Sequence, residues 1–259
     1  MNRMQADITG KVVLVTGGTK GIGLVIAASY ASQGAQVIVC GRNLSDEQAT
    51  TLKEKKLDFY AVDVRDADAL TGMFEFIDKK YGKLDIVINN AGGSPYALAA
   101  DASPRFHEGI IRLNLLAPLH VAQQANRLMQ RNTHGGTIIF IGSISALRPS
   151  PGTAAYGAAK AGILKLVESL AVEWAPKVRV VTVSPGLVKT EQSHLHYGDE
   201  KGIAAVAETI PLGRMATPKD VADACLFASS PAASYISGSN ILLHGGGEKP
   251  AFLTAANNS

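Results

Sequence analysis

The chain has 259 residues, of which 46% are hydrophobic and 18% are charged, and this composition excludes a disordered protein. The formal net charge is only +3 and the basic residues are scattered, so neither nucleic-acid binding nor attachment to a membrane surface is expected.

The first half of the chain alternates between predicted strands and helices. Residues 11–16 are nearly all apolar, as expected of a parallel strand that is covered on both faces. A glycine-rich loop at 17–23 and a helix at 24–33 follow, and Gly34 ends that helix. The next predicted elements are a strand at 36–40, a polar helix at 45–55, a strand at 57–62, a helix at 66–81 and a strand at 84–88.

The second half continues this alternation. Its predicted elements are a long helix at 104–131, a strand at 136–141, a helix at 156–174, a strand at 178–183, a short helical piece at 203–207, a helix at 220–229 and a strand at 241–243. The pattern breaks down between 186 and 214, and we interpret residues 187–214 as a substrate flap. The alternation predicts one α/β domain over residues 1–259, with a doubly wound, seven-stranded parallel sheet and helices on both faces. Such sheets bind ligands at the carboxyl ends of their strands.

The sequence also indicates where the protein works. No run of residues reaches membrane-spanning length, and residues 1–9 contain no stretch typical of a signal peptide. Cys40 and Cys225 lack the spacing of metal ligands and of a disulfide framework. We therefore expect both to be small buried side chains, and the protein to be cytoplasmic, in a reducing compartment.

The glycine loop is a candidate phosphate-binding site. Gly17, Gly21 and Gly23 lie between the first strand and its helix, where missing side chains let a pyrophosphate approach the backbone. Their spacing, Gly-x-x-x-Gly-x-Gly, differs from the general dinucleotide fingerprint. A tight turn without a ligand is the alternative, but the position directly after the first strand favours nucleotide binding.

The end of the second strand predicts which nicotinamide nucleotide binds. An acidic residue there holds the ribose of NAD, whereas an arginine accommodates the 2′-phosphate of NADP. This chain has Arg42 and Asn43 at that place and Lys20 in the glycine loop, without a carboxylate. The pattern favours NADP(H) over NAD(H), unless Arg42 and Lys20 are ordinary solvated surface charges.

Tyr156 and Lys160 are the candidate catalytic pair. They are four residues apart on a predicted helix, so both side chains lie on one face. A phenol titrates near pH ~10, and a neighbouring cation lowers that pKa toward the range of a general acid or base. The alternative is an amphipathic helix whose lysine extends to solvent.

Several motifs in fixed order resemble those of the short-chain dehydrogenase/reductase family. They are Thr16-Gly-Gly-Thr-Lys-Gly21-Ile-Gly23, Asp63-Val64, Asn89-Asn90-Ala91-Gly92, Asn114, Ser143, Tyr156-x-x-x-Lys160 and Pro185-Gly186. The resemblance covers about residues 8–247 and implies a Rossmann-type fold of the compact, single-domain branch. Members usually carry Asn before the Pro-Gly turn, where this chain has Ser184.

The resemblance also implies residue roles. Tyr156 would be the acid/base, Lys160 would lower its pKa, Ser143 would bind the substrate oxygen, and Asn114 would hold a water linked to Lys160. The residues implied to bind the cofactor are Gly17, Thr19, Lys20, Gly21, Ile22, Gly23, Arg42, Asn43, Asp63, Val64, Asn90, Ala91, Gly92, Tyr156, Lys160, Pro185, Gly186, Val188 and Thr190. Taken singly, Ser143 could be a turn residue, Asn114 a satisfied buried amide and Asp63 a helix N-cap.

The predicted substrate site is largely apolar. Its expected lining is Gly93, Ser94, Ser145, Arg148, Leu187, His194 and Tyr197, with Leu195 and His196 in the same flap. This lining favours an apolar or cyclic alcohol or ketone, such as a steroid or an acyl thioester. Arg148 is interpreted either as a receptor for a carboxylate or phosphate chain or as a rim residue. No metal is expected, because His194 and His196 lack further ligands nearby.

The family resemblance implies a homotetramer, or a dimer, with Trp174 and the tail after Gly247 as candidate contact surfaces. The expected partner is otherwise a small molecule. The rival hypothesis to an enzyme is a nucleotide-binding protein that keeps the fold and has no turnover.

Overall fold

The protein forms one parallel sheet of seven strands, as the sequence predicts. The computed structural model describes residues 8–191, 193–250 and 252, except the side chains of Leu195 and His196. The strand order is β3-β2-β1-β4-β5-β6-β7. The strands are β1 Val12–Thr16, β2 Gln36–Gly41, β3 Leu57–Ala61, β4 Ile86–Asn89, β5 Gly136–Ile141, β6 Val178–Pro185 and β7 Ser239–Leu243.

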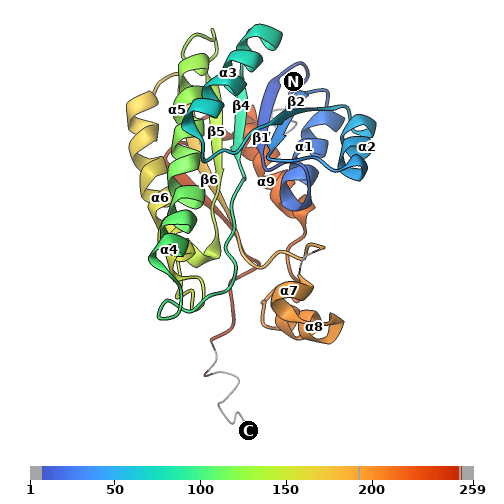
Figure 1. Ribbon diagram of the computed structural model, residues 1–259, viewed down its shortest axis with the longest axis vertical. Coiled ribbons are helices and arrows are strands. Elements are labelled where there is room, and N and C mark those ends of the chain that lie inside the picture. The colour runs from blue at the N-terminus through green and yellow to red at the C-terminus, as the bar shows by residue number, and fades with distance from the viewer. Residues whose placement is uncertain (1–7, 192, 251, 253–259) are drawn as a thin grey trace.

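Helices cover both faces of this sheet (Figure 1). One layer contains α1 Gly21–Ser32, α2 Asp46–Glu54 and α9 Pro218–Ser229. The other contains α3 Ala67–Tyr81, α4 Pro104–Ile111, the π-helical turn η1 Arg112–Leu116, α5 Ala117–Met129 and α6 Ala154–Trp174. This arrangement is the doubly wound α/β architecture that alternating strands and helices predict.

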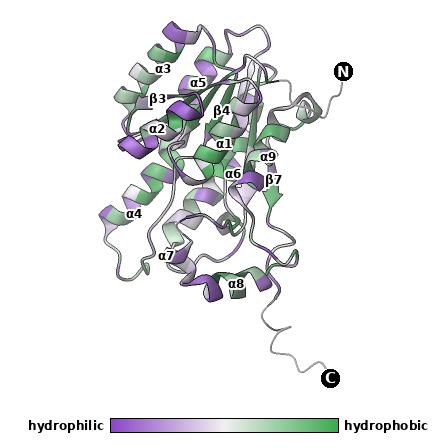
Figure 2. Ribbon diagram, turned by 90° about the vertical axis from the view of Figure 1, so that its right-hand side faces the viewer, coloured by the Kyte–Doolittle hydropathy of each residue, from purple (hydrophilic) through white to green (hydrophobic). Residues whose placement is uncertain are grey.

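The two apolar cores follow from alternation along the strands. Val12 and Leu14 of β1 face the core beneath α3, α5 and α6, whereas Val13 and Val15 face the core beneath α1 and α9. Successive side chains of a strand point to opposite faces, so a strand covered on both sides is apolar throughout. Figure 2 shows the consequence for the helices: α1 is largely hydrophobic, while the peripheral α2 is largely hydrophilic.

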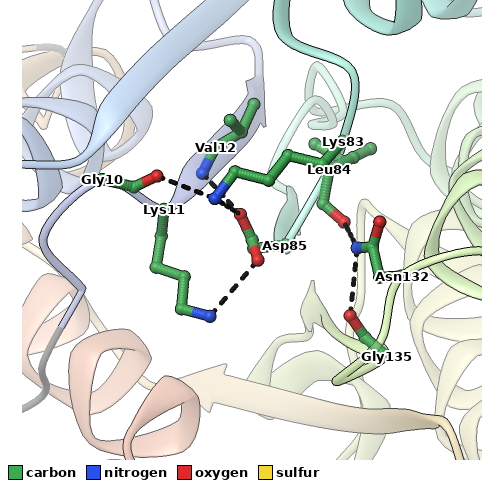
Figure 3. Close-up of polar contacts among 8 residues, drawn as sticks. All are labelled: Gly10, Lys11, Val12, Lys83, Leu84, Asp85, Asn132 and Gly135. Carbon is green, nitrogen blue, oxygen red and sulfur yellow. Dashed lines mark hydrogen bonds and ion pairs between the residues drawn. The ribbon is translucent and has the colours of Figure 1, made fainter.

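An ionic cluster joins the amino ends of β1 and β4 (Figure 3). Asp85, directly before β4, accepts a hydrogen bond of 2.9 Å from the backbone N–H of Val12. Its carboxylate also lies 3.3 Å from the ammonium groups of Lys11 and Lys83. The carboxylate thereby fixes the register at the end of the sheet opposite the predicted ligand site.

Two helix predictions require correction. The helix predicted at 24–33 begins at Gly21, so Gly21 and Gly23 belong to its first turn. The helix predicted at 104–131 is interrupted by the π-helical turn η1. Pro118 has no N–H to give to the carbonyl of Asn114, four residues earlier, so regular α-helical bonding cannot continue through this point.

The predicted flap contains more helix than expected. It includes α7 His194–Tyr197 and α8 Glu200–Glu208, which lie beyond the sheet layers in Figure 1, on the side where β6 ends. The flap has a small apolar core of its own, formed by Ile203, Ile210 and Met215.

Two 3-10 turns, η2 Ile144–Ala146 and η3 Pro231–Ala233, complete the elements. Within the described ranges, no helix combines the length and apolarity needed to cross a bilayer.

The cysteine predictions are confirmed, whereas the predicted contact surfaces stay predictions. Cys40 and Cys225 are both free and fully buried. Trp174, the candidate contact residue at the end of α6, packs against the core but is only partly buried, so part of its side chain remains accessible. Most of the tail after Gly247, including residue 251 and residues 253–259, lies outside the described residues.

Candidate active site

A large cavity lies at the carboxyl ends of the central strands. Its volume is about 740 Å³, which is in the range of cofactor and small-molecule sites. Every residue predicted to bind the cofactor lines this cavity, as do Ser143 and Gly93. The sequence motifs that lie far apart in the chain therefore meet in one place, where parallel sheets bind ligands.

Close backbone packing explains the glycines of the loop after β1. Gly17 has φ +64°, a left-handed conformation that favours glycine. A Cβ on Gly23 would lie 2.3 Å from the carbonyl oxygen of Gly17, so only glycine fits there. The loop reaches the start of α1, where the first backbone N–H groups have no helical acceptor and favour an anion.

Asn90, directly after β4, holds this loop in place through hydrogen bonds. Its side-chain Nδ2 donates to the carbonyl of Thr16 at 2.9 Å and to that of Gly17 at 3.2 Å. The hydroxyl of Thr16 in turn accepts from the backbone N–H groups of Asn90 and Ala91, each at 3.0 Å. The Asn90 side-chain amide therefore holds the glycine loop in place through both of these hydrogen bonds.

The far end of the cavity carries several charges. Lys20 and Arg42 line it and are exposed. Asp63 lies there too, but its carboxylate is bound by Arg65, with the shortest nitrogen–oxygen distance 2.6 Å. The hydrogen bonds from Arg65 lower the pKa of Asp63 below its usual value. The alternative of Asp63 as an N-cap is wrong, because Asp66 caps α3.

Arg65 is a cavity residue that the sequence analysis missed. It directly follows Asp63 and Val64, so its place in that motif was the available signal. Other lining residues outside the predicted set are Cys40, Gly41, Gln48, Val62, Leu113, Ile141, Gly142 and Glu191.

Ser143, Tyr156 and Lys160 meet at the other end of the cavity. Ser143 lies near enough to Tyr156 to lower the pKa of its phenol, although burial outweighs this effect. Lys160 donates to the carbonyl of Ile141 at 2.7 Å, and its Nζ lies 5.6 Å from the centre of the Tyr156 ring. Ser143 also caps η2, accepting from the N–H of Ser145 at 3.1 Å, so its turn role and its place in the cavity coexist.

Burial changes the electrostatics expected for this pair. It raises the pKa of Tyr156, and the neighbouring Ser143 offsets only part of that rise. Burial also lowers the pKa of Lys160 to about 8. The expectation that Lys160 brings the tyrosine pKa down is therefore not met, because desolvation disfavours the charged forms of both side chains.

Asn114 does not line the cavity but clasps the segment beside it. Its Oδ1 accepts from the N–H of Gly93 at 2.8 Å, and its Nδ2 donates to the carbonyls of Gly93 and Ile110, both at 2.9 Å. A Cβ on Gly92 would lie 2.7 Å from Oδ1 of Asn114 and 3.5 Å from Nζ of Lys160. The buried amide is thus satisfied, as one alternative anticipated, and the expected water remains a prediction.

Most of the predicted substrate-lining residues lie outside this cavity. Ser94 donates to the carbonyl of Pro95, and His194 is exposed with Nδ1 bonded to the carbonyl of Glu191. Leu187 and Tyr197 pack into the flap core. Ser145 and Arg148 lie on the loop after β5 without lining the cavity, which includes only Gly93 of the predicted set.

Residues 8–248 match a family model described as enoyl-(acyl carrier protein) reductase. A 3-oxoacyl-[acyl-carrier-protein] reductase FabG of Thermotoga maritima is 33% identical over 248 residues, which cover 92% of this chain and 98% of the relative. An uncharacterized short-chain type dehydrogenase/reductase of Sinorhizobium fredii is 32% identical over 92% of this chain, but the match spans only 43% of that longer protein.

A solved structure is also similar. It is a 7α-hydroxysteroid dehydrogenase complexed with NADH and 7-oxo glycochenodeoxycholic acid, with a TM-score of 0.87 and 29% sequence identity. The match covers 96% of this chain and 98% of that one.

Proposed function

Because the chain belongs to the short-chain dehydrogenase/reductase family, we propose that it transfers a hydride between NADP(H) and an alcohol or ketone, with Tyr156 as the acid/base. The observation that carries this proposal is that Ser143, Tyr156 and Lys160 line one end of a cavity whose other end is the glycine loop. A carbonyl held between the hydroxyls of Ser143 and Tyr156 would lie in the same cavity as the cofactor.

Each residue of the site has a defined part in this proposal. The nicotinamide, when bound, supplies or accepts the hydride. Ser143 and Tyr156 donate hydrogen bonds to the substrate oxygen, where negative charge develops during reduction. The raised pKa of Tyr156 keeps the phenol protonated at neutral pH, which is the form that donates a proton. Lys160 holds positive charge below pH 8 and stabilises the phenolate that remains.

The cavity fits a dinucleotide. The glycines at 17 and 23 leave backbone exposed to a pyrophosphate, and the start of α1 favours its charge. Lys20 and Arg42 support the choice of NADP(H), because Arg65 already neutralises Asp63, the nearby lining acid. NAD(H) is the alternative, which the NADH-bound steroid dehydrogenase of similar fold favours.

The substrate proposed is largely apolar or cyclic. The flap contributes an apolar core around Ile203, Ile210 and Met215, and the loop after β5 exposes Leu147. The names of the relatives point to two chemical classes, a 3-oxoacyl thioester and a steroid. Both carry a carbonyl next to a large apolar body.

A substrate panel with Tyr156→Phe tests the chemistry. We expect NADPH consumption with at least one ketone among steroids, 3-oxoacyl thioesters, enoyl thioesters and simple cyclic ketones. Tyr156→Phe should keep nucleotide affinity and lose turnover by a factor on the order of 10² or more, because the proton donor is gone. Tyr235→Phe, which alters a fully exposed tyrosine, is the matched control. Binding of nucleotide without turnover of any substrate would instead favour the rival nucleotide-binding protein.

Arg42→Ala tests the cofactor choice. Removing a guanidinium from the ribose end should weaken NADPH binding about tenfold and leave NADH binding nearly unchanged, since a charge-assisted bond to phosphate contributes ~1.5–3 kcal/mol. Fluorescence titration of both nucleotides measures this. Arg127→Ala, on the exposed side of α5, is the control. An unchanged preference in Arg42→Ala would remove the argument from Arg42.

A further inference from the structure

Arg148 lies beside the proposed active site but is turned toward another segment. It follows Ser143 by five residues, on the loop after β5. This loop packs on the first turn of α6: a Cβ on Gly157, next to Tyr156, would lie 3.1 Å from the carbonyl oxygen of Ser145. Arg148 is therefore close to Ser143 in sequence, on a loop that contacts the turn carrying Tyr156. About two-thirds of its side chain is buried.

The Arg148 guanidinium forms an ion pair with Glu248, which follows β7 near the C-terminus. Nη2 of Arg148 lies 2.9 Å from Oε1 of Glu248, and Nη1 donates to the carbonyl of Pro149 at 3.2 Å. The buried Nε has no hydrogen-bond partner among the described residues. The arginine thus keeps donor capacity that its one carboxylate partner does not use.

Glu248 is held in place by the flap. It belongs to residues 244–249, which we name the C-terminal strap. The N–H of Leu212 donates to the carbonyl of Gly245 at 3.1 Å, and the N–H of Lys249 donates to that of Thr209 at 3.0 Å. Tyr197, in the flap core, interacts electrostatically with both Arg148 and Glu248. Strap, flap and loop therefore meet at this ion pair, next to the loop that carries Ser143.

We propose that Glu248 is a specificity-determining residue that neutralises Arg148 and so makes the enzyme reject substrates with a carboxylate at the end remote from the reacting carbon. This inference rests on the proposed function and deepens it. A substrate anion that reaches Arg148 meets the Glu248 carboxylate, and like charges at such a distance repel. An uncharged apolar tail meets a neutral ion pair instead.

The inference predicts a latent anion site. With Glu248→Gln the side-chain shape is kept and the negative charge is lost, so the guanidinium can pair with a substrate carboxylate. An ion pair whose side chains are about one-third exposed contributes at most ~1 kcal/mol. The preference for the acid over the ester should therefore change by about fivefold, and this change should become smaller as salt is added.

The experiment compares straight-chain keto acids of increasing length with their methyl esters. For wild type we expect the ester to have the higher kcat/KM at every length. In Glu248→Gln the acid-to-ester ratio should rise about fivefold at low ionic strength, and most at the chain length that spans from Tyr156 to Arg148. The double variant Arg148→Met with Glu248→Gln should lose that gain. Asp223→Asn, which alters an exposed pair with Lys219 on α9, should leave the ratio unchanged.

Calorimetric binding of medium-chain fatty carboxylates and their methyl esters to the same variants provides a readout that does not need turnover. The acid-to-ester binding ratio should follow the same pattern. An unchanged ratio in Glu248→Gln, or a gain that persists in the double variant, overturns the role of Glu248. A protein that reduces no ketone at all overturns the proposed function, and the binding ratio then decides this inference alone.

Discussion

At the residue scale, Lys160 is a cation in surroundings that disfavour its charge. Burial lowers its pKa to about 8, whereas an unfolded lysine titrates near ~10.4. Between these two values the unfolded chain binds more protons than the folded one, so stability rises with pH through this window. The buried lysine therefore lowers the stability of the folded protein at neutral pH.

This argument predicts a pH-dependent difference between wild type and Lys160→Met. As pH rises from about 8 to ~10.4, wild type should gain unfolding free energy relative to the variant, on the order of 3 kcal/mol in total. Urea unfolding at several pH values measures it. Lys165→Met is the control: Lys165 is exposed on the same helix and Glu168 raises its pKa, so no such gain is expected. Parallel curves for wild type and Lys160→Met would contradict the desolvation argument.

At the scale of elements, Asp85 joins β1 to β4 at the amino ends of the strands. Its carboxylate is mostly buried and accepts from the Val12 N–H, so truncation leaves a buried donor unpaired. We predict that Asp85→Ala lowers the unfolding free energy by ~1–3 kcal/mol without changing nucleotide affinity, because the cavity lies at the opposite ends of the strands. Chemical denaturation and nucleotide titration measure the two effects.

A second ion pair provides the comparison for Asp85. Asp78 of α3 lies 2.7 Å from Arg131, and both side chains are exposed. Asp78→Ala should therefore change stability by less than ~0.5 kcal/mol. Equal losses in the two variants would mean that Asp85 contributes only as a surface charge, and a loss of nucleotide affinity in Asp85→Ala would mean that the two ends of the sheet are coupled.

At the scale of the whole molecule, exposed apolar residues gather near one edge of the sheet. β7 is an edge strand with Leu242 partly exposed, Tyr235 lies just before it and is fully exposed, and Phe227 of α9 is also exposed. Val172 on the outer side of α6 is 81% exposed. Such residues favour contact with a second copy of the chain, in agreement with the proposed homotetramer.

We predict that Tyr235→Asp reduces the size of the assembly by at least one step, because it puts a charge into a contact surface that should be apolar. Light scattering coupled to size-exclusion chromatography measures the mass of wild type and variant. Thr50→Asp, on the exposed surface of α2, is the control. A monomeric wild type, or an unchanged mass in Tyr235→Asp, would contradict this use of the β7 edge.

The sequence by itself determined the order of strands and helices, because hydrophobic period and glycine position are local signals. It also predicted the residues that line the cofactor part of the cavity, since motifs that follow parallel strands must meet at the carboxyl edge of the sheet, but most of the residues that it predicted to line the substrate site lie outside this cavity. It missed the break at η1, although Pro118 carried the signal, and it placed the start of α1 at Leu24, whereas the helix begins at Gly21.

Only the tertiary structure decided how the side chains pair and what burial does to them. The commitment of Asn90 to the glycine loop, and the capture of Arg148 by Glu248, join residues many positions apart that no local pattern connects. The raised pKa of Tyr156 likewise reverses an expectation based on its neighbour four residues away. Desolvation depends on every segment packed around a group, so its magnitude is a property of the fold and not of the motif.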